Sequence, residues 1–171
     1  MSPDTILSTL DQAKLESMIQ DFNSGQFKAV LRAGGLQTKV PSACVLQKAR
    51  RRIWSRRILD GIKENRQGIA GELIYQWLLN HRRQMLVDYL NALGVKHVRG
   101  ETEETFTKTI PEENLINEAV KLMERYEPRD VAIYTLFLDY HQESGVYTGN
   151  PRIGSALKTG NAGEAVQQAE Q

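Results

Sequence analysis

The stretch "QKARRRIWSRRILDGI", residues 47–62, holds a dense group of basic side chains. Six basic residues fall within the ten positions 48–57, and no acidic residue lies among them. Arginine guanidinium groups donate paired hydrogen bonds to phosphates and to carboxylates, so this stretch is a candidate binding surface for nucleic acid or for an acidic protein partner. Its candidate binding residues are Arg50, Arg51, Arg52, Arg56 and Arg57.

Two interpretations of the basic stretch stay open. In the first, the arginines contact nucleic-acid phosphates and Trp54 stacks on a base. In the second, the basic face is solvated, or its arginines pair with carboxylates elsewhere in the chain. The second interpretation is favoured because the chain has a pI of about 7.8, whereas nucleic-acid-binding domains usually have a pI above about 9. Residues 101–130 also hold nine acidic against four basic residues.

Arg82 is a second candidate for binding chemistry. On a helix predicted over 69–93, Arg82 lies within an apolar arc, one turn from Leu78 and Leu86. A charge there must reach solvent, pair with an acid or bind an anion, because isolated burial is too costly. Pairing is favoured, and the other two outcomes stay open. The candidate anion-binding group consists of Tyr75, His81, Arg82, Arg83 and Tyr89.

The sequence offers no catalytic signature. It contains no G-x-S-x-G motif and no G-K-[S/T] phosphate loop. Three histidines and one cysteine do not have the spacing of a zinc site. We therefore predict no catalytic residue, no metal and no cofactor, and enzyme activity has no positive support.

The elements that must position these residues are predicted to be helices. Apolar residues recur at helical spacing along most of the chain, whereas strand patterns are scarce. We predict an all-α fold, a compact bundle or helical array of five to six helices that forms a single domain over 1–145. The predicted helices are 2–22, 26–33, 47–62, 69–93, 109–128 and 129–144.

Three local features refine this prediction. Thr109 and Glu112 have the spacing of a capping box at the start of a helix. The Thr-rich segment 95–110 is either a short β-hairpin around Gly100 or a long loop. Residues 146–171, rich in Gly, Ala, Asn and Gln, are predicted to form a mobile, flexible tail because they have too few large apolar residues to offset the entropy of ordering.

The remaining features concern the cellular compartment. Cys44 is the only cysteine, so it cannot form an intramolecular disulfide, and we interpret it as a small buried apolar residue. The first residues do not have the pattern of a signal peptide. The longest apolar stretch, 131–138, is much shorter than a membrane span requires. These observations favour a cytoplasmic protein with no membrane partner.

The two halves of the chain carry opposite charges. Residues 1–85 have 14 Lys+Arg and 7 Asp+Glu, hence +7, and residues 86–171 have 8 and 14, hence −6. We predict a non-catalytic intracellular helical module for protein interaction, with a protein partner or a homo-oligomer formed through the basic 48–57 and acidic 101–130 surfaces. Two alternatives stay open: a nucleic-acid-associated protein that uses 48–57, and an enzyme or binder of an anionic small molecule at Arg82.

Overall fold

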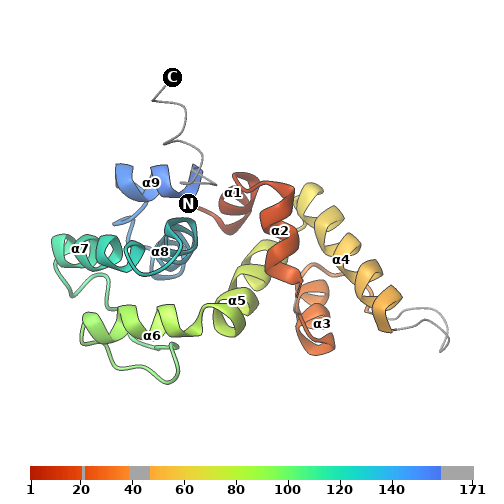
Figure 1. Cartoon of the computed structure of the whole chain (residues 1–171), viewed down its shortest axis with the longest axis horizontal. Coiled ribbons are helices and arrows are strands. Elements are labelled where there is room, and N and C mark those ends of the chain that lie inside the picture. The colour runs from red at the N-terminus through yellow and green to blue at the C-terminus, as the bar shows by residue number, and fades with distance from the viewer. Residues whose placement is uncertain (21, 39–46, 159–171) are drawn as a thin grey trace. The chain divides into compact units, whose positions relative to one another are not determined.

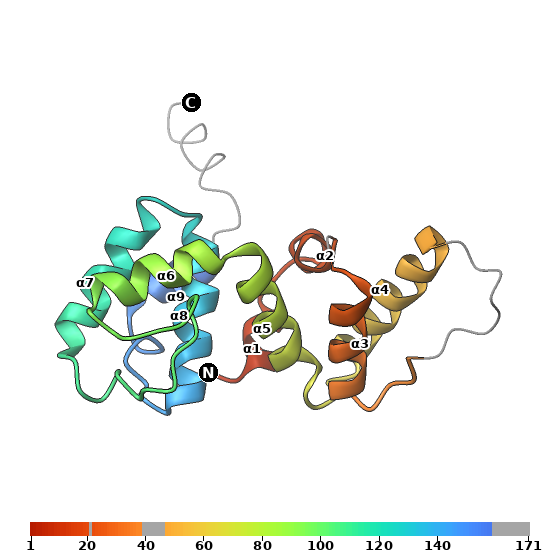
Figure 2. The same ribbon diagram turned by 90° about the horizontal axis from the view of Figure 1, so that it is seen from below.

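The computed structural model describes residues 1–20, 22–38 and 47–158. Within these ranges all regular secondary structure is helical, in nine helices, which confirms the all-α prediction. The chain divides into two compact units (Figures 1 and 2), Pro3–His81 and Met1–Ser2 with Arg82–Gln171, called here the first and the second unit. The prediction of one domain over 1–145 stays a prediction. Cys44 and the tail residues 159–171 lie outside the described residues.

The first unit is built around one apolar helix. Its helices are α1 (Pro3–Ser8), α2 (Gln12–Ile19), α3 (Ser24–Ala33), α4 (Gln47–Lys63) and α5 (Ile69–His81). Helix α5 packs against each of the other four. Its buried side chains include Leu73, Ile74 and Trp77, which are at most 2% exposed. Burying large apolar side chains of this kind stabilises a fold by roughly 1.5–3 kcal/mol each.

Two glycines set the position of the basic helix α4. A Cβ atom added to Gly34 would lie 2.2 Å from Cγ1 of Ile69, and one added to Gly61 would lie 2.3 Å from Cδ1 of Ile69. A residue with a Cβ at either position would require the side chain of Ile69 to move. The end of α3 and the last turns of α4 therefore close on the first residue of α5.

The predicted helix over 2–22 is in fact two helices. Helix α1 ends at Ser8, where the hydroxyl of Thr9 donates to the carbonyl of Ile6 at 2.7 Å. The carboxylate of Asp11 then accepts from the backbone N–H of Lys14 at 2.7 Å and starts α2. Short polar side chains compete with the helix for backbone groups, so a helical apolar pattern is interrupted here.

The second unit contains α6 (Arg83–Ala92), α7 (Glu112–Met123), α8 (Pro128–Gln142) and α9 (Pro151–Lys158). Helix α8 is its centre, because it packs against both α7 and α9, while α6 packs against α7. Seven consecutive residues of α8, 131–137, are buried. This burial explains why their sequence is apolar all round rather than on one face.

The predicted helix over 69–93 is also interrupted. Helix α5 ends at His81, and α6 begins at Arg83. Arg82, between them, has φ −128° and ψ 15°, outside the helical geometry. Because of this interruption, Arg82 does not lie in the apolar arc where an unbroken helix would place it.

The segment 95–110 is a loop with one tight turn. In the described residues it contains no strand, only an isolated antiparallel bridge between Val98 and Glu101 around Gly100. The capping box predicted farther along is wrong. The hydroxyl of Thr109 donates instead to the carbonyl of Phe106 at 2.9 Å, and α7 begins at Glu112 after Pro111.

The helical part of the chain extends past residue 145, where the sequence analysis placed the start of the tail. Tyr147 is fully buried, and α9 buries Ile153 and Leu157. The buried carboxylate of Asp139 accepts from the backbone N–H groups of Tyr147 and Thr148, at 2.9 and 2.7 Å. These contacts order the segment that contains α9, although its composition, with few large apolar residues, does not predict a helix.

The helices that the structure describes include none with both the length and the apolar character needed to cross a membrane.

Candidate functional site

The basic helix α4 is held by apolar contacts with more than one neighbour. Trp54 and Ile58, one turn apart, are 3% and 0% exposed. The ring of Trp54 lies 5.6 Å from that of Phe27 in α3, and α4 also packs against α2 and α5. This arrangement explains why the apolar residues of α4 do not form one stripe. Trp54 is buried and is not available for stacking on a base.

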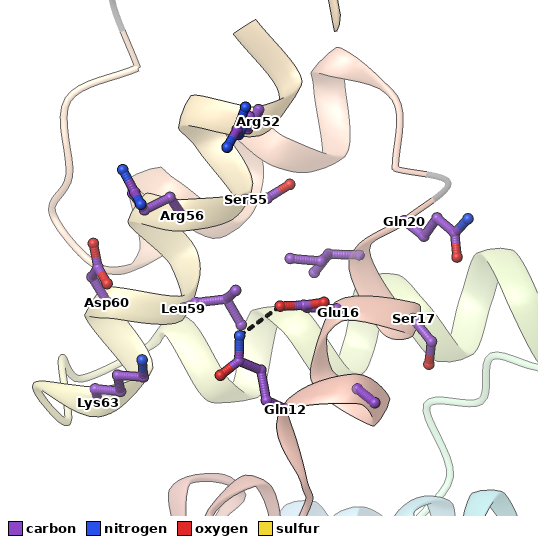
Figure 3. Close-up of a pocket in the computed structure, with 12 residues that line it drawn as sticks. Gln12, Glu16, Ser17, Gln20, Arg52, Ser55, Arg56, Leu59, Asp60 and Lys63 are labelled. Atoms are coloured by element: carbon purple, nitrogen blue, oxygen red, sulfur yellow. Dashed lines mark hydrogen bonds between the residues drawn. The ribbon is translucent and has the colours of Figure 1, made fainter. Parts of the chain in front are cut away.

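One face of α4 borders an open groove of about 860 Å³ whose other wall is α2 (Figure 3). Arg52, Arg56 and Lys63 lie on this face, at spacings of four and seven residues, which bring side chains to one side of a helix. Ser55 and Leu59 lie between them. We call this space the α2–α4 groove.

The α2 wall of the groove is polar. Gln12, Glu16, Ser17 and Gln20 line it, and Figure 3 shows the amide of Gln12 donating to the carboxylate of Glu16, at 2.7 Å. The apolar lining consists of Ala13, Ile19 and Leu59. No aromatic side chain lines the groove among the described residues.

The groove carries charges of both signs. Its cations are Arg52, Arg56 and Lys63, and its carboxylates are Glu16 and Asp60. None of these five groups forms an ion pair with a described carboxylate or cation of the first unit. Arg52 and Arg56 are exposed, so water solvates them until a partner supplies an acceptor.

The other three candidate arginines of α4 do not line the groove. Arg51 is exposed, and Arg57 donates to the carbonyl of Gln37 at 3.0 Å. The Nε atom of Arg50 is buried and has no hydrogen-bond partner within the described ranges of the chain. The structure therefore divides the five arginines of the basic stretch, and only Arg52 and Arg56 line one cavity.

Arg82 pairs with an acid, which is the favoured outcome of the sequence analysis. Its Nε donates to the carboxylate of Asp130 in α8. Asp130 is 1% exposed, whereas the side chain of Arg82 is 33% exposed. A buried carboxylate needs a cation or several hydrogen bonds to remain charged. Arg82 thus serves a structural ion pair within the second unit.

The rest of the predicted anion-binding group is divided between the two units. Tyr75 and His81 belong to the first unit, where His81 stacks on Phe22 with ring centroids 6.1 Å apart. In the second unit, Arg83 donates to the carbonyl of Arg99 at 3.4 Å. The hydroxyl of Tyr89 is buried, where it donates to the carbonyl of Leu115 at 3.0 Å and binds the hydroxyl of Tyr147.

Two carboxylates that the sequence analysis did not single out are central to the second unit. Asp139 is 3% exposed and accepts from the hydroxyls of Ser144 and Thr148 as well as from two backbone N–H groups. Asp88 accepts from Gln84, Arg125 and Tyr126. Burial raises the pKa of Asp88, but the hydrogen bonds from Gln84 and Tyr126 and the charge of Arg125 outweigh burial and lower it overall.

Neither of these carboxylates belongs to a metal site. Among the described residues, no group of three His, Cys, Asp or Glu side chains is placed to hold a metal ion. Comparison with protein-family models, with curated proteins and with solved structures finds no match to this chain. The α2–α4 groove is the candidate site, because it combines an open cavity with cations that have no ion-pair partner among the described residues of their unit.

Proposed function

We propose that this chain is a non-catalytic helical interaction module that binds an acidic segment of a protein partner in the α2–α4 groove. The observation that carries the proposal is that Arg52 and Arg56 line the groove without a carboxylate partner among the described residues of their unit. Guanidinium groups one helical turn apart can each bind a carboxylate with two hydrogen bonds.

The shape and lining of the groove support a macromolecular partner over a small molecule. Small-molecule sites are concave, mostly apolar, and bury most of the ligand. The α2–α4 groove is open and is lined mainly by charged and amide side chains. A bound peptide would place carboxylates near Arg52 and Arg56 and leave its other side in solvent.

The same lining favours a protein over a nucleic acid. Proteins that bind single-stranded nucleic acid combine a positive groove with aromatic side chains for stacking. The groove has no aromatic lining among the described residues, and Trp54 is 3% exposed.

A binding titration tests the proposal. The full chain is titrated with a labelled glutamate-rich peptide and with a single-stranded DNA oligonucleotide of the same net charge, at low and at high salt. We expect the peptide to bind at low salt, and R52Q/R56Q to weaken binding by about tenfold or more, because each charged hydrogen bond contributes about 1.5–3 kcal/mol.

The matched control is R32Q/R51Q, which removes the same charge from exposed positions outside the groove. It should weaken peptide binding much less than R52Q/R56Q. Tighter binding of the oligonucleotide, or equal losses in the two double variants, contradicts the proposal. Absence of peptide binding at low salt does so as well.

A further inference from the structure

The second unit has an acidic loop whose charge is opposite to that of the cations in the α2–α4 groove. Residues 101–104, "ETEE", carry three carboxylates, and we call them the acidic loop. Glu103 and Glu104 are exposed and form no ion pair with another described side chain. The loop borders a hollow of about 730 Å³ that is also lined by Lys96, His97 and Val98.

The acidic loop follows a tight turn at residues 98–101, and the backbone conformation of this turn is defined. The backbones of Val98 and Glu101 exchange two hydrogen bonds, at 2.8 and 3.1 Å. Arg99 and Gly100 between them both have positive φ, 54° and 86°, as a type I′ turn requires. A Cβ added to Gly100 would lie 3.0 Å from Cβ of Leu86, so the turn lies against α6. The turn thus fixes the start of the acidic loop at Glu101.

Next to the loop, Val98 is 77% exposed, more than any other large apolar side chain in the described residues. A single exposed apolar residue needs no explanation in itself. Here it stands beside three carboxylates and a lysine. The lining of the α2–α4 groove has complementary side chains: it contains arginines for the carboxylates, and the apolar side chains of Ala13 and Leu59 for Val98.

We propose that the acidic loop of a second copy of this chain occupies the α2–α4 groove, with Glu103 and Glu104 on Arg52 and Arg56. This inference rests on the proposed function and names its partner. The charges match in both directions, because Lys96 beside the loop supplies a cation for the groove carboxylates Glu16 and Asp60. A uniformly anionic polymer has no such cation.

The two surfaces lie on different units of the chain, and the groove of one copy receives the loop of another. Each copy keeps one groove and one loop. Removing either surface should therefore weaken self-association of that variant, while the other surface stays competent to bind.

Sedimentation of the full chain, over a range of concentrations and at two salt concentrations, tests this inference. We expect the wild-type mass to rise with concentration at low salt and to fall toward the monomer at high salt, because opposite charges are screened. E103Q/E104Q and R52Q/R56Q should each raise the dissociation constant about tenfold or more. An equimolar mixture of the two variants should recover one contact and form a dimer.

Two control variants make the result specific. E112Q/E113Q removes two exposed carboxylates in the first turn of α7, outside the acidic loop, and R32Q/R51Q removes two exposed arginines outside the groove. Both should self-associate like the wild type. Thermal unfolding checks that every variant folds.

The outcomes separate this inference from the proposed function. A chain that stays monomeric at low salt, yet binds the glutamate-rich peptide through Arg52 and Arg56, overturns the inference and leaves the proposed function standing. Self-association that E103Q/E104Q does not weaken overturns the inference too. If the chain neither self-associates nor binds the peptide, both fail.

Discussion

The two units of this chain treat their charged side chains differently. In the second unit, the carboxylate of Asp130 is buried and that of Asp88 is partly buried, and each pairs with an arginine, Arg82 and Arg125 respectively. In the first unit, Arg52 and Arg56 are exposed and have no carboxylate partner among the unit's described residues. The structure therefore contains buried charges that need a partner within the fold and exposed charges that remain available.

This difference teaches which charges maintain the fold. A buried charge must be paired. Removing one partner leaves the other charge buried without compensation, and this greatly lowers the free energy of unfolding. An exposed arginine is solvated, so its removal changes the free energy of unfolding little. Substitutions in the two units should therefore have very different effects on stability, and the following predictions test that contrast from the largest effect to the smallest.

Asp139→Ala should have the largest effect. It removes the acceptor of four hydrogen bonds that connect the end of α8 to the segment before α9, and it leaves the N–H of Tyr147 unpaired in a buried site. We expect the free energy of unfolding to fall by about 3–5 kcal/mol, measured by chemical denaturation.

Asp139→Asn is the matched control. Its carbonyl oxygen can accept the three hydrogen bonds now made to Oδ2, and its amide can donate to the hydroxyl of Ser144. It should cost clearly less than Asp139→Ala. Equal losses would indicate that the negative charge matters more than the hydrogen-bond acceptor.

Arg82→Met should have the next largest effect. It removes the cation bound to Asp130, whose side chain is 2% exposed in the ion pair. We expect a loss of about 2–3 kcal/mol in the free energy of unfolding, because a buried carboxylate would lose the ion pair with Arg82. Arg51→Met, an exposed arginine of α4, should change it by no more than about 0.5 kcal/mol.

A double variant gives the sharper check on this ion pair. In R82M/D130L both charges are absent, so the double variant should lose less stability than the sum of R82M and D130L. Additive losses would show that the two side chains do not depend on each other.

The case of Arg82 shows how far the sequence reaches. Its position in the predicted apolar arc favours pairing with an acid over the two other outcomes, because helical periodicity and the cost of a buried charge are local arguments. The partner, Asp130, lies 48 residues away. No local pattern identifies it, since only the packing of the second unit brings the two together.

The groove shows a second limit. The sequence identifies the basic stretch and its helix, but it does not predict that α2 forms the opposite wall. Residues 2–22 have enough apolar periodicity to predict one helix, and the interruption depends on hydrogen bonds from Thr9 and to Asp11. Asp11 is a good N-cap residue and was the signal that could have revealed the second helix.

The tail boundary illustrates a third limit. Composition correctly describes residues 146–158 as poor in large apolar side chains, but it does not register that Tyr147 and Ile153 are each fully buried. A few buried side chains and one buried acceptor, Asp139, suffice to order the segment through α9. A prediction from composition describes the segment as a whole and does not detect such individual contacts.

Acid should destabilise the second unit in two steps. Burial lowers the pKa of His141 below its ordinary value of 6.5, and the pKa of Asp88 also lies below its ordinary value of 3.8. For both groups the unfolded chain binds the proton more readily. Stability should therefore be fully present above about pH 6.5, fall slightly as His141 protonates, and fall further below about pH 4 as Asp88 does.

Thermal unfolding across this pH range measures both steps. His141→Gln should remove the step near neutral pH, and Asp88→Asn should remove the acidic step while lowering the stability at pH 7. The groove variant R52Q/R56Q should keep the wild-type pH dependence. A pH profile that is unchanged in Asp88→Asn would contradict the assigned role of the Asp88 ion pair.

The smallest effect on stability is expected in the groove itself. R52Q/R56Q removes two exposed charges from α4, and glutamine has nearly the helix propensity of arginine. The free energy of unfolding should therefore change by no more than about 0.5 kcal/mol, measured by chemical denaturation beside Arg82→Met. A loss of 2 kcal/mol or more would mean that these arginines pair within the folded chain, as Arg82 does. The contrast between the two units would then disappear, and with it the reason for expecting a partner at the groove.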